Sequence, residues 1–317
     1  MLSAYVSEAL LHSGKRIVVT GAGGWLGLAT LELLHSALGT EFDSRVRCFG
    51  SGERALALVD GTIVRQRALP AIAQLDPEST FVLHLAFLTK DRAEGMDEDE
   101  YKTANRLLSR TVLESLDKIG AEGIFVASSG AAGFADDPHA SAAMRLYGAL
   151  KREDEEIFAA WADRSNKRAA IARIFNISGP HINKHGSYAL ACFILDALAG
   201  RPVSVRAPHR VVRGYVAIRE LMSLVFALLL DGRKGVTRFS SGGEPMEMQA
   251  IAETVATLLG PVPVHRPPLT NDRADDYTGD DAAYRRLLAE HGIKPVPFGQ
   301  QVSETAGFLA AERVESR

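Results

Sequence analysis

The stretch 16-RIVVTGAGGWLGLATLELL-34 decides how the first half of the chain folds. Its opening residues are mostly β-branched and predict a buried strand, and an apolar-striped helix is predicted after the glycines. Gly21, Gly24 and Gly27 lie between the two elements. Glycine here permits a tight turn, a close approach of the backbone to a pyrophosphate, and close packing of the helix against the strand. The stretch therefore predicts a dinucleotide-binding turn, and a Gly-rich turn without a ligand is the alternative.

Short β-branched runs alternate with helical stretches over the next part of the chain. Strands are expected at 45–50, 61–66, 80–87, 123–129 and 169–177, with long helices between them. Such alternation forms βαβ units, which build a parallel sheet covered on both faces. The predicted fold class is α/β, a Rossmann-like doubly wound parallel sheet with a smaller α/β C-terminal substrate lobe. We expect a dinucleotide-binding domain over 1–180 and a substrate-binding lobe over 181–317, interleaved with the sheet rather than cleanly separated.

The composition of the 317 residues excludes several classes of protein. The net charge of −3 gives no polybasic surface, so neither nucleic acid nor a membrane is an expected partner. No apolar run reaches the roughly 18 residues that span a bilayer. The first residues lack the basic leader of a secretory signal. Cys48 and Cys192 stand apart from other metal-type ligands, so we expect reduced thiols, no metal site and a cytoplasmic protein.

Several motifs follow one another in an order typical of one enzyme family. They are TGAGGWLG (20–27), VLHLA (82–86), TAN (103–105), FVASSG (125–130), YGALK (147–151), ARIFNISGP (172–180) and RGYVAIREL (213–221). Together they resemble the extended short-chain dehydrogenase/reductase family, the NAD-dependent epimerases and dehydratases that modify nucleotide sugars. The resemblance covers most of the chain and implies an NAD(P)-dependent enzyme. It implies a cofactor site made of Gly21, Gly24, Trp25, Leu26, Gly27, Ser51, Arg54, Leu85, Ala86 and Lys151.

The resemblance also gives the catalytic residues. Tyr147 and Lys151 are four residues apart and share one face of a helix, a spacing that alone fits two polar side chains facing water. The family pattern implies that Tyr147 is the acid/base, that Lys151 favours its phenolate and bonds the nicotinamide ribose, and that a serine holds the substrate oxygen. Ser129 fits by its distance from the strand start and is preferred, whereas Ser128 fits by its distance to Gly133.

Two polar residues near this site receive supporting assignments. His84 lies in an apolar strand and is expected to pack beside the cofactor rather than to act as an acid/base. Asn105 is expected to bond backbone and hold the active-site helix, with a solvent-facing position as the alternative.

The second strand carries the signal for the choice between NAD and NADP. An acidic side chain usually ends this strand in NAD-selective proteins and accepts a hydrogen bond from the ribose 2′-OH. The expected position here is Gly50, while Ser51 and Arg54 follow and suit a 2′-phosphate. The cofactor is therefore NADP or NAD, with a lean to NADP.

The C-terminal lobe holds the candidate substrate residues. By the resemblance, Arg213 and Arg273 contact a substrate diphosphate and Asn176 touches substrate or cofactor. The alternative for the two arginines is a surface ion pair with Asp or Glu. The alternative for Asn176 is an ordinary hydrogen bond within a loop. The substrate implied is a nucleotide sugar.

The residues directly after the candidate active-site serine narrow the choice among reaction types. The sequence continues as GAAG without the acidic pair of the family's dehydratases, so dehydration is disfavoured. Epimerisation is the first hypothesis, an NADPH-dependent ketoreductase the second, and a non-catalytic dinucleotide sensor the third. The helices at 101–118 and 145–162 resemble the family's dimer interface, so a homodimer is expected. Their apolar residues are alternatively packed on the sheet; they are Leu107, Leu108, Leu116, Ile157, Phe158 and Trp161.

Overall fold

The computed structural model describes residues 1–93, 95–270 and 274–315, and the chain divides into two compact units. The first unit comprises Met1–Ile174 and Met222–Ser240, and the second comprises Phe175–Leu221 and Ser241–Arg317. The chain therefore leaves the first unit before residue 180 and returns to it for one helix and one strand.

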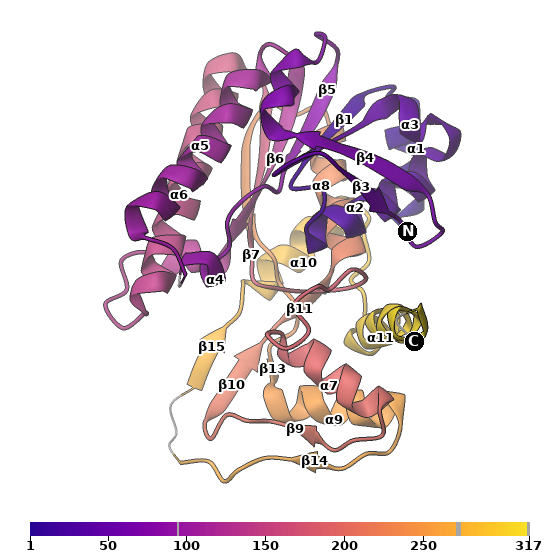
Figure 1. Cartoon of the computed structure of the whole chain (residues 1–317), viewed down its shortest axis with the longest axis vertical. Coiled ribbons are helices and arrows are strands. Elements are labelled where there is room, and N and C mark those ends of the chain that lie inside the picture. Colours follow the sequence, from indigo (N-terminus) through magenta and orange to yellow (C-terminus); the bar gives the residue numbers. More distant parts are fainter. Residues whose placement is uncertain (94, 271–273, 316–317) are drawn as a thin grey trace. The chain divides into compact units, whose positions relative to one another are not determined.

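A large sheet forms the first unit (Figure 1). Its strands are β1 Arg16–Thr20, β2 Val46–Gly50, β3 Arg54–Ala57, β4 Ile63–Ala68, β5 Thr80–His84, β6 Ala121–Ser129, β7 Arg168–Ile174 and β12 Gly235–Ser240. The order across the sheet is β12-β7-β6-β5-β1-β2-β4-β3, and each neighbouring pair is parallel except β3 with β4. The predicted parallel sheet is confirmed, with an added antiparallel strand, β3, at its edge.

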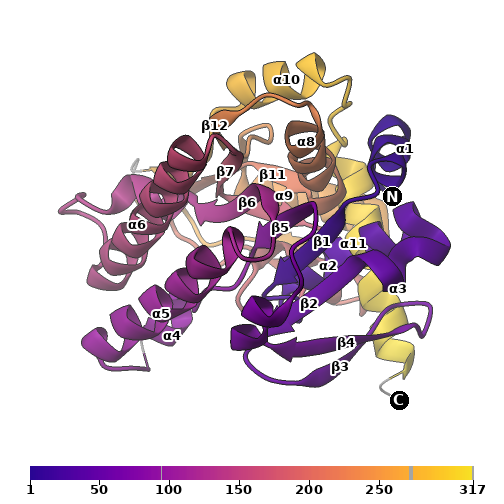
Figure 2. The ribbon, with the colours of Figure 1, turned by 90° about the horizontal axis from the view of Figure 1, so that it is seen from above.

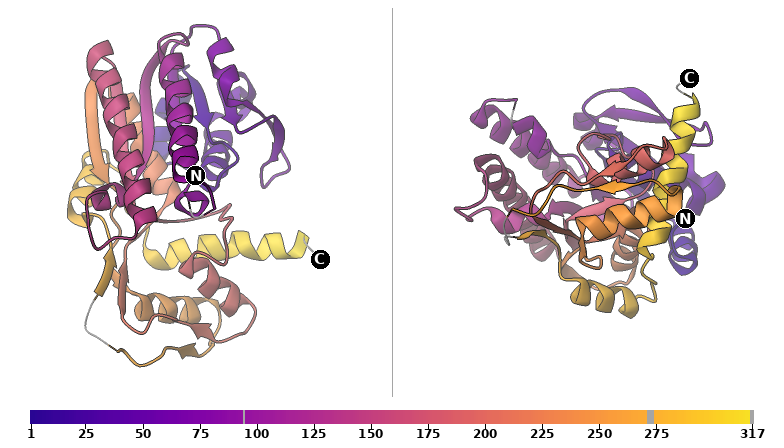
Figure 3. Two further views of the ribbon diagram at one scale, coloured as in Figure 1. Left: turned by 60° about the vertical axis from the view of Figure 1, so that its left-hand side comes forward. Right: turned by 90° about the horizontal axis from the view of Figure 1, so that it is seen from below.

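Helices cover the two faces of this sheet. They are α1 Ala4–His12, α2 Trp25–Leu38, α3 Phe42–Arg45, α4 Lys90–Ala93, α5 Glu98–Leu116, α6 Ala142–Ser165 and α8 Ile218–Leu230, with short 3-10 helices η1 Gly39–Glu41, η2 Leu69–Gln74 and η3 Gly130–Phe134. The chain moves in opposite directions across the sheet from β1 to β2 and from β5 to β6. Because such crossovers are right-handed, α2 and α5 lie on opposite faces. Figures 2 and 3 show α5 and α6 side by side.

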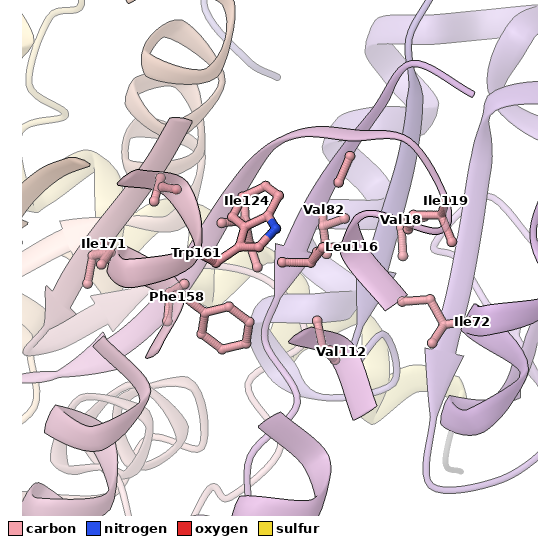
Figure 4. Packing of buried hydrophobic residues seen from close by; sticks show 14 of the residues in the cluster. Val18, Ile72, Val82, Val112, Leu116, Ile119, Ile124, Phe158, Trp161 and Ile171 are labelled. Atoms are coloured by element: carbon pink, nitrogen blue, oxygen red, sulfur yellow. The ribbon is translucent and has the colours of Figure 1, made fainter. Parts of the chain in front are cut away.

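A hydrophobic core lies between the sheet and the α5–α6 face (Figure 4). Val18, Val82 and Ile124 project from three neighbouring strands toward these helices. Side chains alternate along a strand, so the intervening residues of β1 and β5, which are also buried, face the helices opposite. The helix side of this core includes three residues considered for a dimer interface, Leu116, Phe158 and Trp161. These three pack on the sheet, as the alternative predicted, and Leu107 remains 51% exposed.

The second unit contains small sheets and several helices. Its strands are β8 Asn176–Ser178, β9 Val203–Ser204, β10 Arg210–Arg213, β11 Tyr215–Ala217, β13 Met246–Glu247, β14 Val264–His265 and β15 Ala274–Tyr277, and its helices are α7 Ala189–Leu198, α9 Met248–Leu259, α10 Asp281–Glu290 and α11 Phe298–Glu315. Strand β10 is central in a sheet of order β13-β10-β15, and α7, α9 and α11 pack on one another. Among the described residues, no helix combines the length and the apolar character needed to cross a membrane.

Candidate active site

The glycine turn after β1 is closed tightly against the segment that follows β5. Gly21 has a φ of +69°, and a Cβ there would lie 2.7 Å from the Ala86 nitrogen and from the Leu85 carbonyl carbon. A Cβ on Gly27 would lie 2.4 Å from the Gly21 oxygen. The sequence predicted these two needs, a tight turn and close helix packing. Since Gly24 is the N-cap of α2 and has no side chain, the helix start presents backbone N–H groups with the positive end of the helix dipole.

A residue that the sequence motifs did not single out lies against the glycine turn and the end of β2. Gln66, on β4, is 1% exposed. Its Oε1 accepts the Gly23 N–H at 3.1 Å, and its Nε2 donates to the Gly52 carbonyl at 2.8 Å. A Cβ on Gly50 would lie 2.4 Å from the amide carbon of Gln66, so a carboxylate cannot stand at residue 50 while Gln66 stays there. The Gln66 amide thus occupies the space that a side chain at residue 50 would need.

Arg54 lies against the glycine turn. The Arg54 Nη2 is 1.6 Å from the position that a Cβ on Gly23 would take, so the guanidinium packs directly on this glycine. Arg54 and Ser51 are both exposed. The fold therefore brings the predicted Arg54 to the loop, where its charge faces the site expected for the phosphates.

Tyr147 and Lys151 project from the first half of α6. This helix begins after Ser141, whose hydroxyl accepts the Met144 N–H, and ends at Asn166 in the left-handed conformation. Lys151 is 5% exposed, and its Nζ donates to the Ala127 carbonyl at 2.8 Å. Burial lowers the pKa of Lys151 to about 8, against the opposing charges of Asp154 and Glu155.

Phe87 contacts both members of the pair. The Lys151 Nζ lies 3.6 Å from the centre of the Phe87 ring, and the Tyr147 ring meets the same ring edge-on with centres 5.8 Å apart. Phe87 follows Ala86 directly in the chain, so the segment that closes on Gly21 also reaches α6. Sequence reasoning missed Phe87, and its only signal was its position after VLHLA.

The two candidate serines have different partners. Ser128 donates to Oε1 of Glu155, which is 1% exposed and paired with Arg173 at 2.8 Å. The Ser129 hydroxyl accepts the Ala131 N–H at 3.2 Å at the start of η3. Adjacent strand residues point to opposite faces. The Ser128 hydroxyl is therefore used in a hydrogen bond to the buried carboxylate of Glu155 on α6.

Helix α6 meets this turn beside Tyr147. A Cβ on Gly148 would lie 2.1 Å from the Ala131 oxygen, so the helix backbone and η3 are in direct contact. The residue next to Tyr147 thus touches the turn that Ser129 begins. The ends of β6 and β1 lie at the same edge of the sheet, because both strands are parallel to β5 between them.

Asn105 and His84 are both buried and hydrogen-bonded. The Asn105 Oδ1 accepts the Leu88 N–H at 2.8 Å, and its Nδ2 donates to the Tyr101 carbonyl at 3.2 Å. The prediction that Asn105 bonds backbone is confirmed. The His84 Nδ1 lies 3.1 Å from Thr20 Oγ1, and its Nε2 lies 3.5 Å from Asp154 Oδ2.

Two candidate substrate-binding residues of the second unit, Arg213 and Asn176, are hydrogen-bonded to neighbouring residues. The Arg213 guanidinium donates to Asp275 Oδ2 and to the Asp275 carbonyl, both at 2.8 Å, which is the pairing that the alternative predicted. The Asn176 Nδ2 donates to the Gly214 and Tyr277 carbonyls at 3.2 Å. Arg273 lies outside the described residues.

Comparison with known proteins assigns the family. Residues 17–240 match the NAD dependent epimerase/dehydratase family. The chain belongs to this family. The UDP-glucuronic acid decarboxylase 3 of Arabidopsis thaliana is 31% identical over 91 residues, which are 29% of this chain and 26% of the plant protein. The chain thus aligns with about a quarter of the length of the curated relatives it matches.

Solved structures share the fold of this epimerase/dehydratase-family enzyme. The UDP-N-acetylglucosamine 4-epimerase of Methanobrevibacter ruminantium, solved with UDP-N-acetylmuramic acid, has a TM-score of 0.72 at 17% identity, covering 94% of this chain and 99% of the other. The UDP-glucose 4-epimerase of Thermus thermophilus, solved with NAD, has a TM-score of 0.68 at 21% identity, covering 93% and 99%. The cofactor in that second structure is NAD, which gives no support to the lean to NADP.

The glycine turn and the start of α2 fit the family's dinucleotide. At Gly21 and Gly27 a Cβ would collide with backbone, and these are two positions of the turn where the family's cofactor needs close backbone packing. Together with Gly24, Trp25 and Leu26, they form the turn and the helix start that would hold the pyrophosphate.

Proposed function

We propose that this enzyme is a nucleotide-sugar epimerase in which Tyr147 is the acid/base. The observation that carries the proposal is the surroundings of Tyr147. It lies one helical turn before the buried Lys151 and beside the turn that begins at Ser129. The serine and the glycine turn belong to the same edge of a parallel sheet, where ligands of such sheets bind.

Each residue has a defined part in the proton chemistry. A dinucleotide held at the glycine turn would supply hydride transfer from the carbinol carbon and back to it. Tyr147, as phenolate, removes the hydroxyl proton, and Ser129 donates to the oxygen as it becomes a carbonyl. Tyr147 returns the proton when the alcohol forms again with inverted configuration. The Lys151 ammonium favours the phenolate throughout.

A specific observation favours the ketoreductase as a second candidate. The position of Arg54 on the glycine turn, with no carboxylate at residue 50, suits the 2′-phosphate of NADPH. Denaturing the purified protein and identifying the released nucleotide separates the two functions. Retained NAD fits an epimerase, whose cofactor is oxidised and reduced on one substrate. An empty site that binds NADPH more tightly than NADH, and loses this preference in Arg54→Ala, fits the reductase.

The substrate part of the proposal rests on the arginine of β10. We propose that Arg213 exchanges Asp275 for the substrate diphosphate, because its fork suits phosphate oxygens as well as a carboxylate. Arg213→Ala should then raise KM for the nucleotide sugar at least tenfold. Asp275→Ala is the matched variant, because it removes the carboxylate that binds the Arg213 guanidinium. Its KM for the nucleotide sugar should be equal to that of the wild type or lower. Equal KM values in wild type and Arg213→Ala would remove the diphosphate from the proposal.

The reaction itself is tested with a small panel of nucleotide sugars. UDP-glucose, UDP-N-acetylglucosamine and UDP-glucuronic acid are among the compounds named for the neighbours and relatives. Incubation with NAD and proton NMR of the products distinguishes an epimer, in which the couplings between the inverted ring proton and its neighbours change, from a decarboxylated pentose. A pentose product from UDP-glucuronic acid would replace epimerisation by decarboxylation.

The homodimer also remains a proposal. Leu107 is exposed on α5, and a cavity of about 240 Å³ lies between α5 and α6, with Phe87, Leu113, Leu150 and Ile157 in its wall. An exposed apolar side chain next to a hollow suits a symmetric contact with a second copy. Light scattering at micromolar concentration should give the mass of a dimer, and Leu107→Asp should shift it toward the monomer. A monomeric wild type would reject the proposal.

A further inference from the structure

Phe87 contacts both Tyr147 and Lys151, and the proposed chemistry gives this residue no part. The Lys151 Nζ lies over the Phe87 ring, 3.6 Å from the ring centre. At this distance the ammonium meets the electron-rich face of the ring, which attracts a cation. The Tyr147 ring meets the Phe87 ring edge-on, with the two planes inclined at 74°. One half-buried aromatic side chain thus touches both residues of the pair.

The chain on both sides of Phe87 is fastened to neighbouring elements. On one side, Thr20 Oγ1 at the end of β1 accepts the Ala86 N–H at 3.3 Å. On the other side, Asn105 Oδ1 on α5 accepts the Leu88 N–H at 2.8 Å. Thr20 and Asn105 are at most 1% exposed. The backbone that carries the Phe87 ring is therefore held by β1 and α5, while the ring itself reaches α6.

The Lys151 ammonium is buried beneath this ring. Lys151 is 5% exposed, and its Nζ donates to the Ala127 carbonyl of β6 at 2.8 Å. Burial removes water from an ammonium group and favours its neutral form. A partner that favours the charged form must then come from the protein around it.

The carboxylates that act on the charge of this lysine are Asp154 and Glu155, and both have partners elsewhere. Arg173 of β7 binds the two oxygens of Glu155 at 2.9 and 2.8 Å. Asp154 Oδ2 lies 3.5 Å from His84 Nε2 of β5. Within the part of the chain that the structure describes, neither carboxylate forms an ion pair with Lys151. The Phe87 ring is thus a direct contact of the ammonium, whereas the two carboxylates act from a distance.

We propose that Phe87 is a positioning residue, whose ring face holds the Lys151 ammonium in its charged form and whose edge-on contact orients the Tyr147 ring. The part that Lys151 plays beside Tyr147 rests on the proposed function. The ring face replaces part of the hydration that the buried ammonium has lost, so the charged form becomes more stable. A charged Lys151 in turn favours the Tyr147 phenolate. Phe87 therefore acts on the acid/base through the lysine.

The test is the titration of Lys151 in Phe87→Leu, which keeps an apolar side chain at this position and removes the aromatic face. Carbon-13 NMR of protein labelled at the lysine ε-carbons, assigned with Lys151→Met, gives the midpoint directly. The midpoint should fall by about one pH unit, the shift that corresponds to a desolvated cation–π contact. Phe42→Leu is the matched control, because Phe42 is 2% exposed and lies on α3 with its ring against His35. Its Lys151 midpoint should equal that of the wild type.

Fluorinated analogues of phenylalanine at residue 87 separate the ring face from simple packing. Fluorine atoms withdraw electrons from the ring and weaken its attraction for a cation, while the size of the ring changes little. Proteins with two and with three ring fluorines at residue 87 should show a graded fall of the Lys151 midpoint. A midpoint at the wild-type value in Phe87→Leu and in both fluorinated proteins would overturn the proposal. A fall in Phe87→Leu alone would also overturn it, because Phe87 would then act by packing.

The acid limb of the pH profile of kcat connects this contact with the reaction. A base that must be ionised produces such a limb, and a weaker ammonium leaves the Tyr147 phenol to ionise at higher pH. Phe87→Leu should therefore move the limb to higher pH, while Phe42→Leu keeps the wild-type profile. An unmoved limb beside a lowered Lys151 midpoint would overturn the part of Phe87 in positioning the acid/base.

The outcome is separable from that of the proposed function. If Tyr147→Phe keeps turnover while the Lys151 midpoint falls in Phe87→Leu and in the fluorinated proteins, the contact with the ammonium stands and the proposed function fails. If Tyr147→Phe abolishes turnover and none of these proteins changes the midpoint, the proposed function stands and the role of Phe87 fails.

Discussion

Replacing Gly27 by alanine tests the packing of the glycine turn. The new Cβ would lie 2.4 Å from the Gly21 oxygen and 2.5 Å from the Ala22 oxygen, whereas ordinary van der Waals contact begins at 3.4 Å. Both partners are backbone atoms and cannot rotate away. The start of α2 must therefore move about 1 Å from the turn, which is the difference between 3.4 and 2.4 Å.

This displacement has two measurable consequences. Overpacking of this kind typically lowers the free energy of unfolding by about 1–3 kcal/mol. The backbone N–H groups at the helix start move with it, so the pyrophosphate loses well-aligned bonds, and a tenfold weaker cofactor corresponds to about 1.4 kcal/mol.

Urea unfolding with and without NAD measures both effects. At a concentration of 100 times the wild-type Kd, NAD should stabilise the wild type by about 2.7 kcal/mol and a variant of tenfold weaker affinity by about 1.4 kcal/mol. Gly307→Ala is the matched control, because Gly307 lies within α11 with nothing within 4 Å of the new Cβ. It should gain roughly 0.5–1 kcal/mol from helix propensity. Wild-type stability and wild-type NAD stabilisation in Gly27→Ala would refute the packing argument.

Two further predictions concern other buried contacts. Burial raises the pKa of Glu220 to about 7 from an ordinary value of 4.5, so between these values the folded state keeps a proton that the unfolded state has released, and stability falls as pH rises. Glu220→Gln still offers an acceptor to the Val296 N–H. It should remove this fall and raise the free energy of unfolding at pH 8 by roughly 2 kcal/mol, as measured by urea unfolding at pH 5 and 8. An unchanged dependence of stability on pH would count against the prediction. Gly50→Asp should cost about 1–3 kcal/mol because its Cβ meets the Gln66 amide. Gly50→Asp should cost less in a Gln66→Ala background than in the wild type, as measured by thermal unfolding, and an equal cost in the two backgrounds would contradict the steric account.

The features predicted from the sequence are those that depend on local pattern. The alternation of β-branched runs and helices predicted the parallel sheet. The glycine spacing predicted a tight turn, and Gly21 adopts the φ of +69° that this turn needs. Asn105 was predicted to bond backbone, and its amide does so. Local periodicity did not give the edge strand β3, since Arg54–Ala57 is short and mostly exposed.

The contacts that were missed join segments far apart in the chain. Gln66 reaches Gly23 because β4 and β1 flank β2, and nothing near Gln66 in the sequence reveals that partner. Phe87 lies over Lys151 for the same kind of reason. The hydrogen bond of Ser128 to Glu155 on α6 was also missed, because it depends on how the helix docks on the sheet.

The most direct test of acid/base catalysis by Tyr147 is the turnover of Tyr147→Phe on the best substrate of the panel, measured beside its NAD affinity. The phenylalanine keeps the ring that meets Phe87 and removes the hydroxyl. We expect a Kd for NAD within about twofold of wild type and a kcat reduced at least about 100-fold, the usual contribution of a positioned acid/base. Turnover equal to that of wild type, with NAD bound, would contradict the role of Tyr147.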